Sequence, residues 1–181
     1  MSVLVAVVAA VAVSAAACGS SDDEGGEETS AEAWADDVCS SVSSWDSAVT
    51  QAGSTLRDPR DLSVNEARDA VGDVVDATST LVTEVSDLGP PDTEAGEDAQ
   101  ALLETLADDL EAEADVLSDA MDTDADTASE LLADTSTITG ALSTMSADIR
   151  TTLEGIEGLD GAAELQDALA GSESCQQVGV N

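Results

Sequence analysis

The residues of this chain that could carry chemistry are almost all carboxylates. The sequence holds 40 Asp and Glu residues against 4 arginines, and it contains neither histidine nor lysine. Without histidine, the chain lacks the usual general base near neutral pH and the commonest transition-metal ligand. Paired carboxylates can transfer protons, but so many acids produce close pairs by chance on solvated helix faces. We therefore expect a noncatalytic protein that uses no cofactor.

Three aspartates have the spacing of the first three ligands in a calcium-binding loop. These are Asp122, Asp124 and Asp126. An EF-hand also requires glycine at its sixth position and glutamate at its twelfth, where this chain has Thr127 and Ala133. The aspartates are therefore weak metal-ligand candidates, and we expect no specific metal site. Binding or buffering of calcium or other divalent cations is therefore an alternative function, next to binding of a protein or ligand.

The two tryptophans, Trp34 and Trp45, are the only aromatic residues of the chain. They are three helical turns apart, so a helix would place both on the same face. On the surface they could form an aromatic contact for a partner or ligand. Tryptophans are mostly buried, so packing of both rings in a helical core is the competing interpretation.

The chain opens with a run of apolar residues that is typical of an export signal. Residues 3–17 are all Val, Leu, Ala or Ser. A membrane span needs about 20 apolar residues, so this run is too short, but it fits the apolar region of a secretion signal. An ordinary secretory signal would release the protein after cleavage, and a buried apolar helix is a further alternative.

The end of this run, Ala15-Ala16-Ala17-Cys18-Gly19, resembles the lipobox of bacterial lipoproteins. The resemblance implies removal of residues 1–17 and attachment of diacylglycerol to the sulfur of Cys18. It also implies a location at the outer face of the cytoplasmic membrane, with the lipid as the contact to the membrane. Residues 33–45, AWADDVCSSVSSW, are similar to the opening of small secreted helical proteins of actinobacteria, which implies no particular function.

The residues after the lipobox predict a spacer and a disulfide. Residues 18–29, CGSSDDEGGEET, contain only Gly, Ser, Thr and acids after the cysteine, as a flexible tether would. If Cys18 carries lipid, Cys39 and Cys175 form the only possible pair, and a disulfide suits an exported protein. Two unrelated buried thiols are the alternative. Residues 30–181 would then form one domain.

The net charge of −36 at pH 7 limits the partners of this domain. Nucleic acids and anionic membrane surfaces are bound through clustered basic residues, which the sequence lacks. We therefore expect no nucleic acid, and expect an envelope protein or a ligand as the partner. The composition leaves the oligomeric state open.

Apolar residues recur every three or four positions in four segments, which predicts four helices. Thr29 and Glu32 predict a capping box before a helix over residues 30–52, and Ser63 and Glu66 predict one before a helix over residues 63–88. The sequence Gly-Pro-Pro ends the second helix, and Asp92 is predicted to cap the third.

The third predicted helix ends near Met121, and Thr127 with Glu130 predicts the capping box of the fourth, which ends near residue 157. Without that turn, residues 93–157 would form one continuous helix. Short connections favour an all-α fold, namely an antiparallel up-down-up-down four-helix bundle with a flexible N-terminal tether. This topology would bring Cys39 and Cys175 to the same end of the bundle, with a disulfide-tied C-terminal tail.

Overall fold

The structure is a computed structural model that describes residues 29–57, 62–122, 126 and 135–178 of the 181-residue chain. Over these ranges it contains six helices and no strand, which confirms the all-α fold class. The apolar opening run, residues 18–28 of the acidic tether with Cys18, and Asp124 lie outside the described residues. The helices are α1 (Ala31–Thr55), α2 (Val64–Asp87), α3 (Gly96–Met121), α5 (Thr135–Glu157), α6 (Ala163–Gly171) and α7 (Glu173–Gln177).

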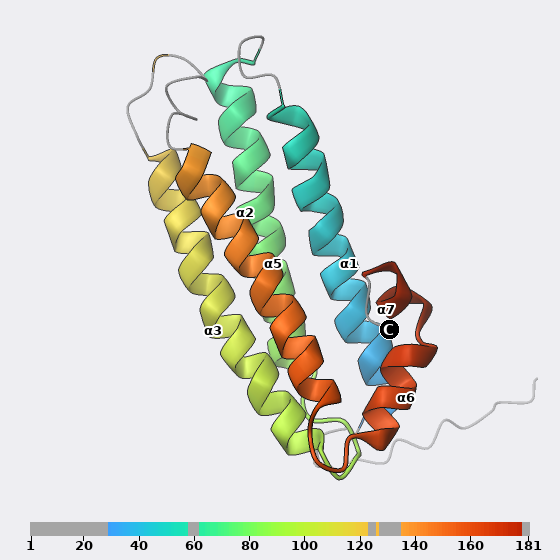
Figure 1. The fold of residues 1–181 in the computed structure, drawn as a ribbon. Coiled ribbons are helices and arrows are strands. Elements are labelled where there is room, and N and C mark those ends of the chain that lie inside the picture. The colour runs from blue at the N-terminus through green and yellow to red at the C-terminus, as the bar shows by residue number, and fades with distance from the viewer. Residues whose placement is uncertain (1–28, 58–61, 123–125, 127–134, 179–181) are drawn as a thin grey trace, which may run out of the picture.

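The four long helices, α1, α2, α3 and α5, lie side by side in a helical bundle (Figure 1). In this bundle α1 packs against α2, α2 against α3, and α3 against α5. The short helices α6 and α7 both pack against α1, and α6 also contacts α5. Because α3 ends at Met121 and α5 packs along it, the alternative of one continuous helix over residues 93–157 is wrong.

The core is built from the apolar stripes that the periodicity predicts, because each long helix turns its apolar face toward its neighbours. Thr78 is a polar member of this core. Its hydroxyl donates to the carbonyl of Val74 at 2.8 Å and accepts the Trp45 indole N–H at 3.0 Å, so both polar groups are satisfied. The predicted stripe residues that are buried are Trp34, Val38, Val42, Trp45, Ala67, Val71, Val74, Thr78, Leu81, Val85, Ala99, Leu103, Leu106, Leu110, Ala114, Leu117, Ile138, Met145, Ile149 and Ile156.

The start of α1 differs from the prediction by one residue. Ser30 caps the helix, with its side chain accepting from the backbone N–H of Ala33 at 3.3 Å. The predicted capping box of Thr29 and Glu32 is wrong, because the N-cap of α1 is Ser30. The carbonyl of Thr29 accepts from the backbone N–H of Asp92 at 2.9 Å. This contact joins the first described residue to the connection between α2 and α3.

The predicted capping role of Asp92 is also wrong. Helix α3 begins at Gly96, four residues later, and its N-cap Ala95 makes no side-chain capping hydrogen bond. The intervening residues form turns, in which Thr93 N–H donates to the Pro91 carbonyl at 2.8 Å. A Cβ atom at Gly96 would lie 2.0 Å from that same carbonyl oxygen, so only glycine fits at the start of α3.

The predicted start of α2 is confirmed. The Ser63 side chain accepts from the Glu66 backbone N–H at 3.2 Å, and Ser63 N–H donates to the Glu66 carboxylate at 2.9 Å. Hydrogen bonding of the Glu66 carboxylate to the Ser63 side chain, and then to the Ser63 backbone N–H, holds the pKa of Glu66 below its ordinary value. After α2, Gly89 has a positive φ of 64°, which glycine adopts without strain. The box predicted at Thr127 and Glu130 lies outside the described residues.

None of the helices in the described part of the chain is both long enough and apolar enough to cross a membrane.

Candidate functional site

The predicted pairing of Cys39 and Cys175 is confirmed as a disulfide between α1 and α7. The two Cα atoms are 4.9 Å apart, and both residues are fully buried. The alternative of two unrelated thiols is therefore wrong. The C-terminal tail is a short helix held against the first half of α1.

Hydrogen bonds around the disulfide strengthen this attachment of α7. The hydroxyl of Ser172, the N-cap of α7, accepts from the backbone N–H of Cys175 at 3.2 Å and donates to the Asp36 carboxylate of α1. Ser40 and Ser174 also share a hydrogen bond of 3.1 Å between α1 and α7. The position of α7 is thus set by the disulfide and by hydrogen bonds to Asp36 and Ser40, which precede and follow Cys39 on α1.

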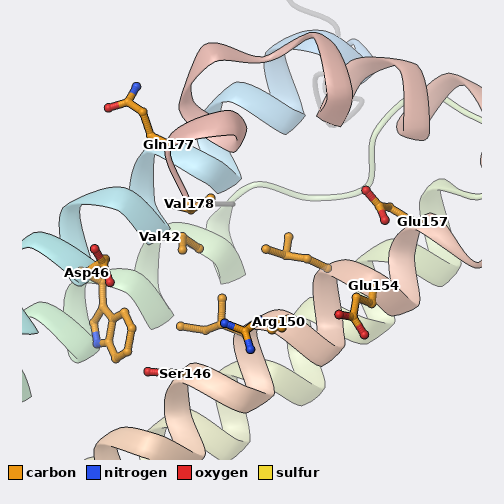
Figure 2. Close-up of a pocket in the computed structure, with 11 residues that line it drawn as sticks. Val42, Asp46, Ser146, Arg150, Glu154, Glu157, Gln177 and Val178 are labelled. Carbon is orange, nitrogen blue, oxygen red and sulfur yellow. The ribbon is translucent and has the colours of Figure 1, made fainter. Parts of the chain in front are cut away.

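The end of α7 forms one wall of a cavity of about 390 Å³ between α1 and α5 (Figure 2), which we call the α1–α5 groove. These two helices are not among the pairs that pack closely against each other, so their side chains leave this space between them. Its apolar lining combines residues of all three helices. The groove is lined by Val42, Trp45, Asp46, Ser146, Ile149, Arg150, Leu153, Glu154, Glu157, Gln177 and Val178.

The lining of the groove separates into an apolar base and a charged rim. Val42, Trp45, Ile149 and Leu153 are each at most 5% exposed, so they form the base rather than the outer edge. The charged side chains lie at the rim, where Figure 2 shows them along the two helices. They are three carboxylates, Asp46, Glu154 and Glu157, and one guanidinium, Arg150.

The two tryptophans occupy different environments. Trp34 is fully buried, and its indole N–H donates to the Gly89 carbonyl at 3.2 Å, so this ring ties α1 to the end of α2 and presents no surface. Trp45 is 3% exposed, donates to Thr78 and lines the groove. Both rings therefore fill the core, and Trp45 alone also borders a space that a ligand could enter.

Of the three aspartates with calcium-loop spacing, the structure describes two. Asp122 and Asp126 are exposed, and Asp124 lies outside the described residues. Over the ranges that the structure describes, no group of three or more cysteine or carboxylate side chains could hold a metal ion. Cys18, the predicted lipidation site, also lies outside these ranges.

One carboxyl group has a pKa above its ordinary range. Burial raises the pKa of Asp148 on α5, and the negative charge of Asp109 on α3 raises it further. A raised pKa can indicate a catalytic acid when the carboxyl group lines a cavity. Asp148 is not among the residues that line the α1–α5 groove, so it supplies no acid there.

Sequence reasoning did not find the charged residues of the groove. Arg150 and Glu154 each follow a buried residue of α5, namely Ile149 and Leu153, and flanking positions of this kind are ordinarily solvated surface. Comparison of the chain with protein-family models, curated proteins and solved structures finds no match. The interpretation of the groove therefore rests on its own geometry and charges.

Proposed function

We propose that this chain is a noncatalytic, lipid-anchored protein of the cell envelope, whose helical domain binds a ligand or partner through the α1–α5 groove. The observation that carries the proposal is the groove itself, which has an apolar base, a charged rim and a wall fixed by the disulfide. Its volume of about 390 Å³ falls in the usual range of small-molecule sites, about 300 to 1,000 Å³.

The cysteines support the lipid anchor. Of the three cysteines in the chain, two are joined in the disulfide, so Cys18 is the cysteine left over. A third cysteine in an exported protein needs another use, and the lipobox-like residues before Cys18 suggest acylation. The mature protein would then consist of a lipidated Cys18, an acidic tether over residues 18–29 and the domain over residues 30–181.

We further propose that the long helices form an antiparallel up-down-up-down four-helix bundle. The packing of α1 on α2, α2 on α3 and α3 on α5 supports this topology, because each helix contacts the next one in the chain. The groove would then be the seam between the first and last helices of the bundle. Helices α6 and α7 cover one end of this seam.

The anchor is tested by the intact mass of the protein extracted from membranes of its native host, measured before and after reduction. We expect a chain that begins at Cys18, carries added acyl mass and gains two hydrogen atoms when the disulfide is reduced. A chain that retains Met1 and lacks acyl mass would contradict the envelope location.

The groove is tested by native mass spectrometry of the same protein, which reports small molecules that remain bound. Ser146 lines the groove, so Ser146→Trp should fill part of it and reduce the bound fraction at least severalfold. Thr151→Trp is the matched control, because Thr151 is exposed on the same helix but does not line the groove. Equal ligand retention in the two variants would contradict the proposed site.

A further inference from the structure

We infer that the α1–α5 groove binds a soluble amphiphilic organic cation, a small molecule with an apolar body and a positively charged amine or ammonium group. This inference rests on the proposed function, because it names the class of ligand for the same groove. It is carried by the apolar base of the groove, by the excess of carboxylates on its rim and by the size of the cavity.

The base of the groove suits an apolar body. Val42 and Trp45 of α1 face Ile149 and Leu153 of α5, and Val178 adds an apolar side chain from the end of α7. Trp45 borders the groove, but its side chain is only 3% exposed, so it closes the apolar base and offers little ring face to a cation. Since Val42, Trp45, Ile149 and Leu153 are at most 5% exposed, a ligand in the groove would mainly remove its own apolar surface, and that of the half-buried Val178, from water.

The rim suits a positive charge. Asp46, Glu154 and Glu157 place three carboxylates at the groove, and Arg150 supplies the one guanidinium. The groove thus carries a net negative charge within a chain whose net charge is −36. A field of one sign concentrates ligands of the opposite sign in a cleft, and here it favours cations over anions.

The size of the groove favours a small molecule over a protein helix. Its volume of about 390 Å³ lies near the lower end of the range for small-molecule sites. Helix α7 limits the groove at the end where Gln177 and Val178 line it. Along α1, the lining covers a single turn, from Val42 to Asp46, which is a short surface for a helix of another protein.

Arg150 makes the inference sharply testable, because it would be the main contact for an anionic ligand and is an unfavourable neighbour for a cationic one. Replacing it should therefore have opposite effects for the two ligand classes. For a cation, Arg150→Gln should tighten binding, whereas for an anion it should weaken binding. Neutralising Asp46 or Glu154 should do the reverse: binding of a cation should weaken, and binding of an anion should tighten.

The experiment titrates the purified full chain with decyltrimethylammonium below its micellar concentration, and follows calorimetric heat and tryptophan fluorescence. Decyl sulfate, with the same alkyl length and the opposite charge, is the matched probe. We expect saturable one-to-one binding of the cation and much weaker binding of the anion. Asp46→Asn and Glu154→Gln should each raise the Kd of the cation about two- to fivefold, and Arg150→Gln should lower it by a similar factor.

Two variants separate binding in the groove from adsorption to an acidic surface. Glu104→Gln removes one exposed carboxylate from α3, away from the groove, and should leave the Kd unchanged. Ser146→Trp should abolish saturable binding. If Glu104→Gln weakens binding as much as Glu154→Gln does, the cation adsorbs to the surface as a whole and the inference is overturned.

The remaining outcomes distinguish the ligand class from the function. Preferential binding of decyl sulfate, lost in Arg150→Gln, would overturn the cationic class and leave the groove as a ligand site. Binding of a synthetic basic amphipathic helix without binding of decyltrimethylammonium would assign the groove to a peptide partner. If no probe binds saturably and native protein carries no ligand, both the inference and the proposed function of the groove fail.

Discussion

Loss of the disulfide should destabilise this domain strongly, and the size of the effect follows from the length of chain that it closes. Cys39 and Cys175 are separated by 136 positions in the sequence. In the chain-entropy model, a link across a loop of this length lowers the entropy of the unfolded state enough to stabilise the fold by about 5 kcal/mol. We expect the double variant Cys39→Ala and Cys175→Ala to lose about this much free energy of unfolding.

The assay is urea unfolding followed by tryptophan fluorescence and by circular dichroism, with the oxidised protein as reference. The two probes report different regions, because Trp34 and Trp45 both belong to α1 whereas circular dichroism averages over all helices. Cys18→Ala is the matched control, since it removes a thiol that is not part of the disulfide. A loss below about 1 kcal/mol for the double variant would refute the chain-entropy reasoning.

The same variant also tests the link between the disulfide and the groove. Gln177 and Val178 line the groove, and the disulfide holds the helix that precedes them. Release of α7 should therefore weaken ligand binding under conditions in which the rest of the domain stays folded. Unchanged binding with a detached α7 would show that the wall formed by α7 contributes nothing to the site.

Three further predictions concern the stability of the fold. Gly96→Ala should lower the free energy of unfolding in urea by about 2 to 4 kcal/mol, because its Cβ would lie 2.0 Å from the Pro91 carbonyl oxygen. Gly72→Ala, in the open middle of α2, is the control and should stabilise the domain. Equal changes in stability for the two variants would contradict the close approach at Gly96. Ser63→Ala should cost about 1 kcal/mol through the lost cap of α2, and no change in urea midpoint would contradict its capping role. Asp148→Asn should raise Tm at pH 7, because the raised pKa of Asp148 means that its ionised form destabilises the folded state. This gain should shrink as the pH falls through the raised pKa and vanish below the ordinary value of 3.8, and a gain independent of pH would contradict the assignment.

The helices could be predicted from the sequence because their apolar residues recur with the period of a helix. The stripe of α2, from Ala67 to Val85, is buried as expected, and the capping box at Ser63 forms as expected. The disulfide followed from counting cysteines together with the lipobox resemblance. These features depend on local patterns or on simple pairing rules, which a single sequence contains.

The ends of α1 and α3 could not be predicted because they depend on a tertiary contact. Thr29 and Asp92 each have a side chain suited to capping, and local propensity favours them. In the fold their backbones bond to each other, Ser30 caps α1, and α3 starts later, at Gly96. This contact joins residues far apart in the sequence, so no local pattern contains it.

The groove could not be predicted for a related reason, since it forms where two helices of the bundle do not pack closely. Arg150 and Glu154 follow the periodicity of solvated positions, and nothing local distinguishes them from the other charged residues of α5. Their place in the groove depends on the position of α1, which packs against α2, α6 and α7.

The disulfide that attaches α7 to α1 helps to explain how the domain remains folded although α1 and α5 leave the groove between them. The buried core contains many Ala and Val residues, which bury less apolar area per residue than Leu, Ile or Phe would. A groove that leaves part of α1 and α5 without helix contacts reduces the stabilising area further. The disulfide offsets this cost by acting on the unfolded state, so it stabilises the domain without filling the groove. The disulfide can therefore stabilise the domain while the groove stays open to bind a ligand.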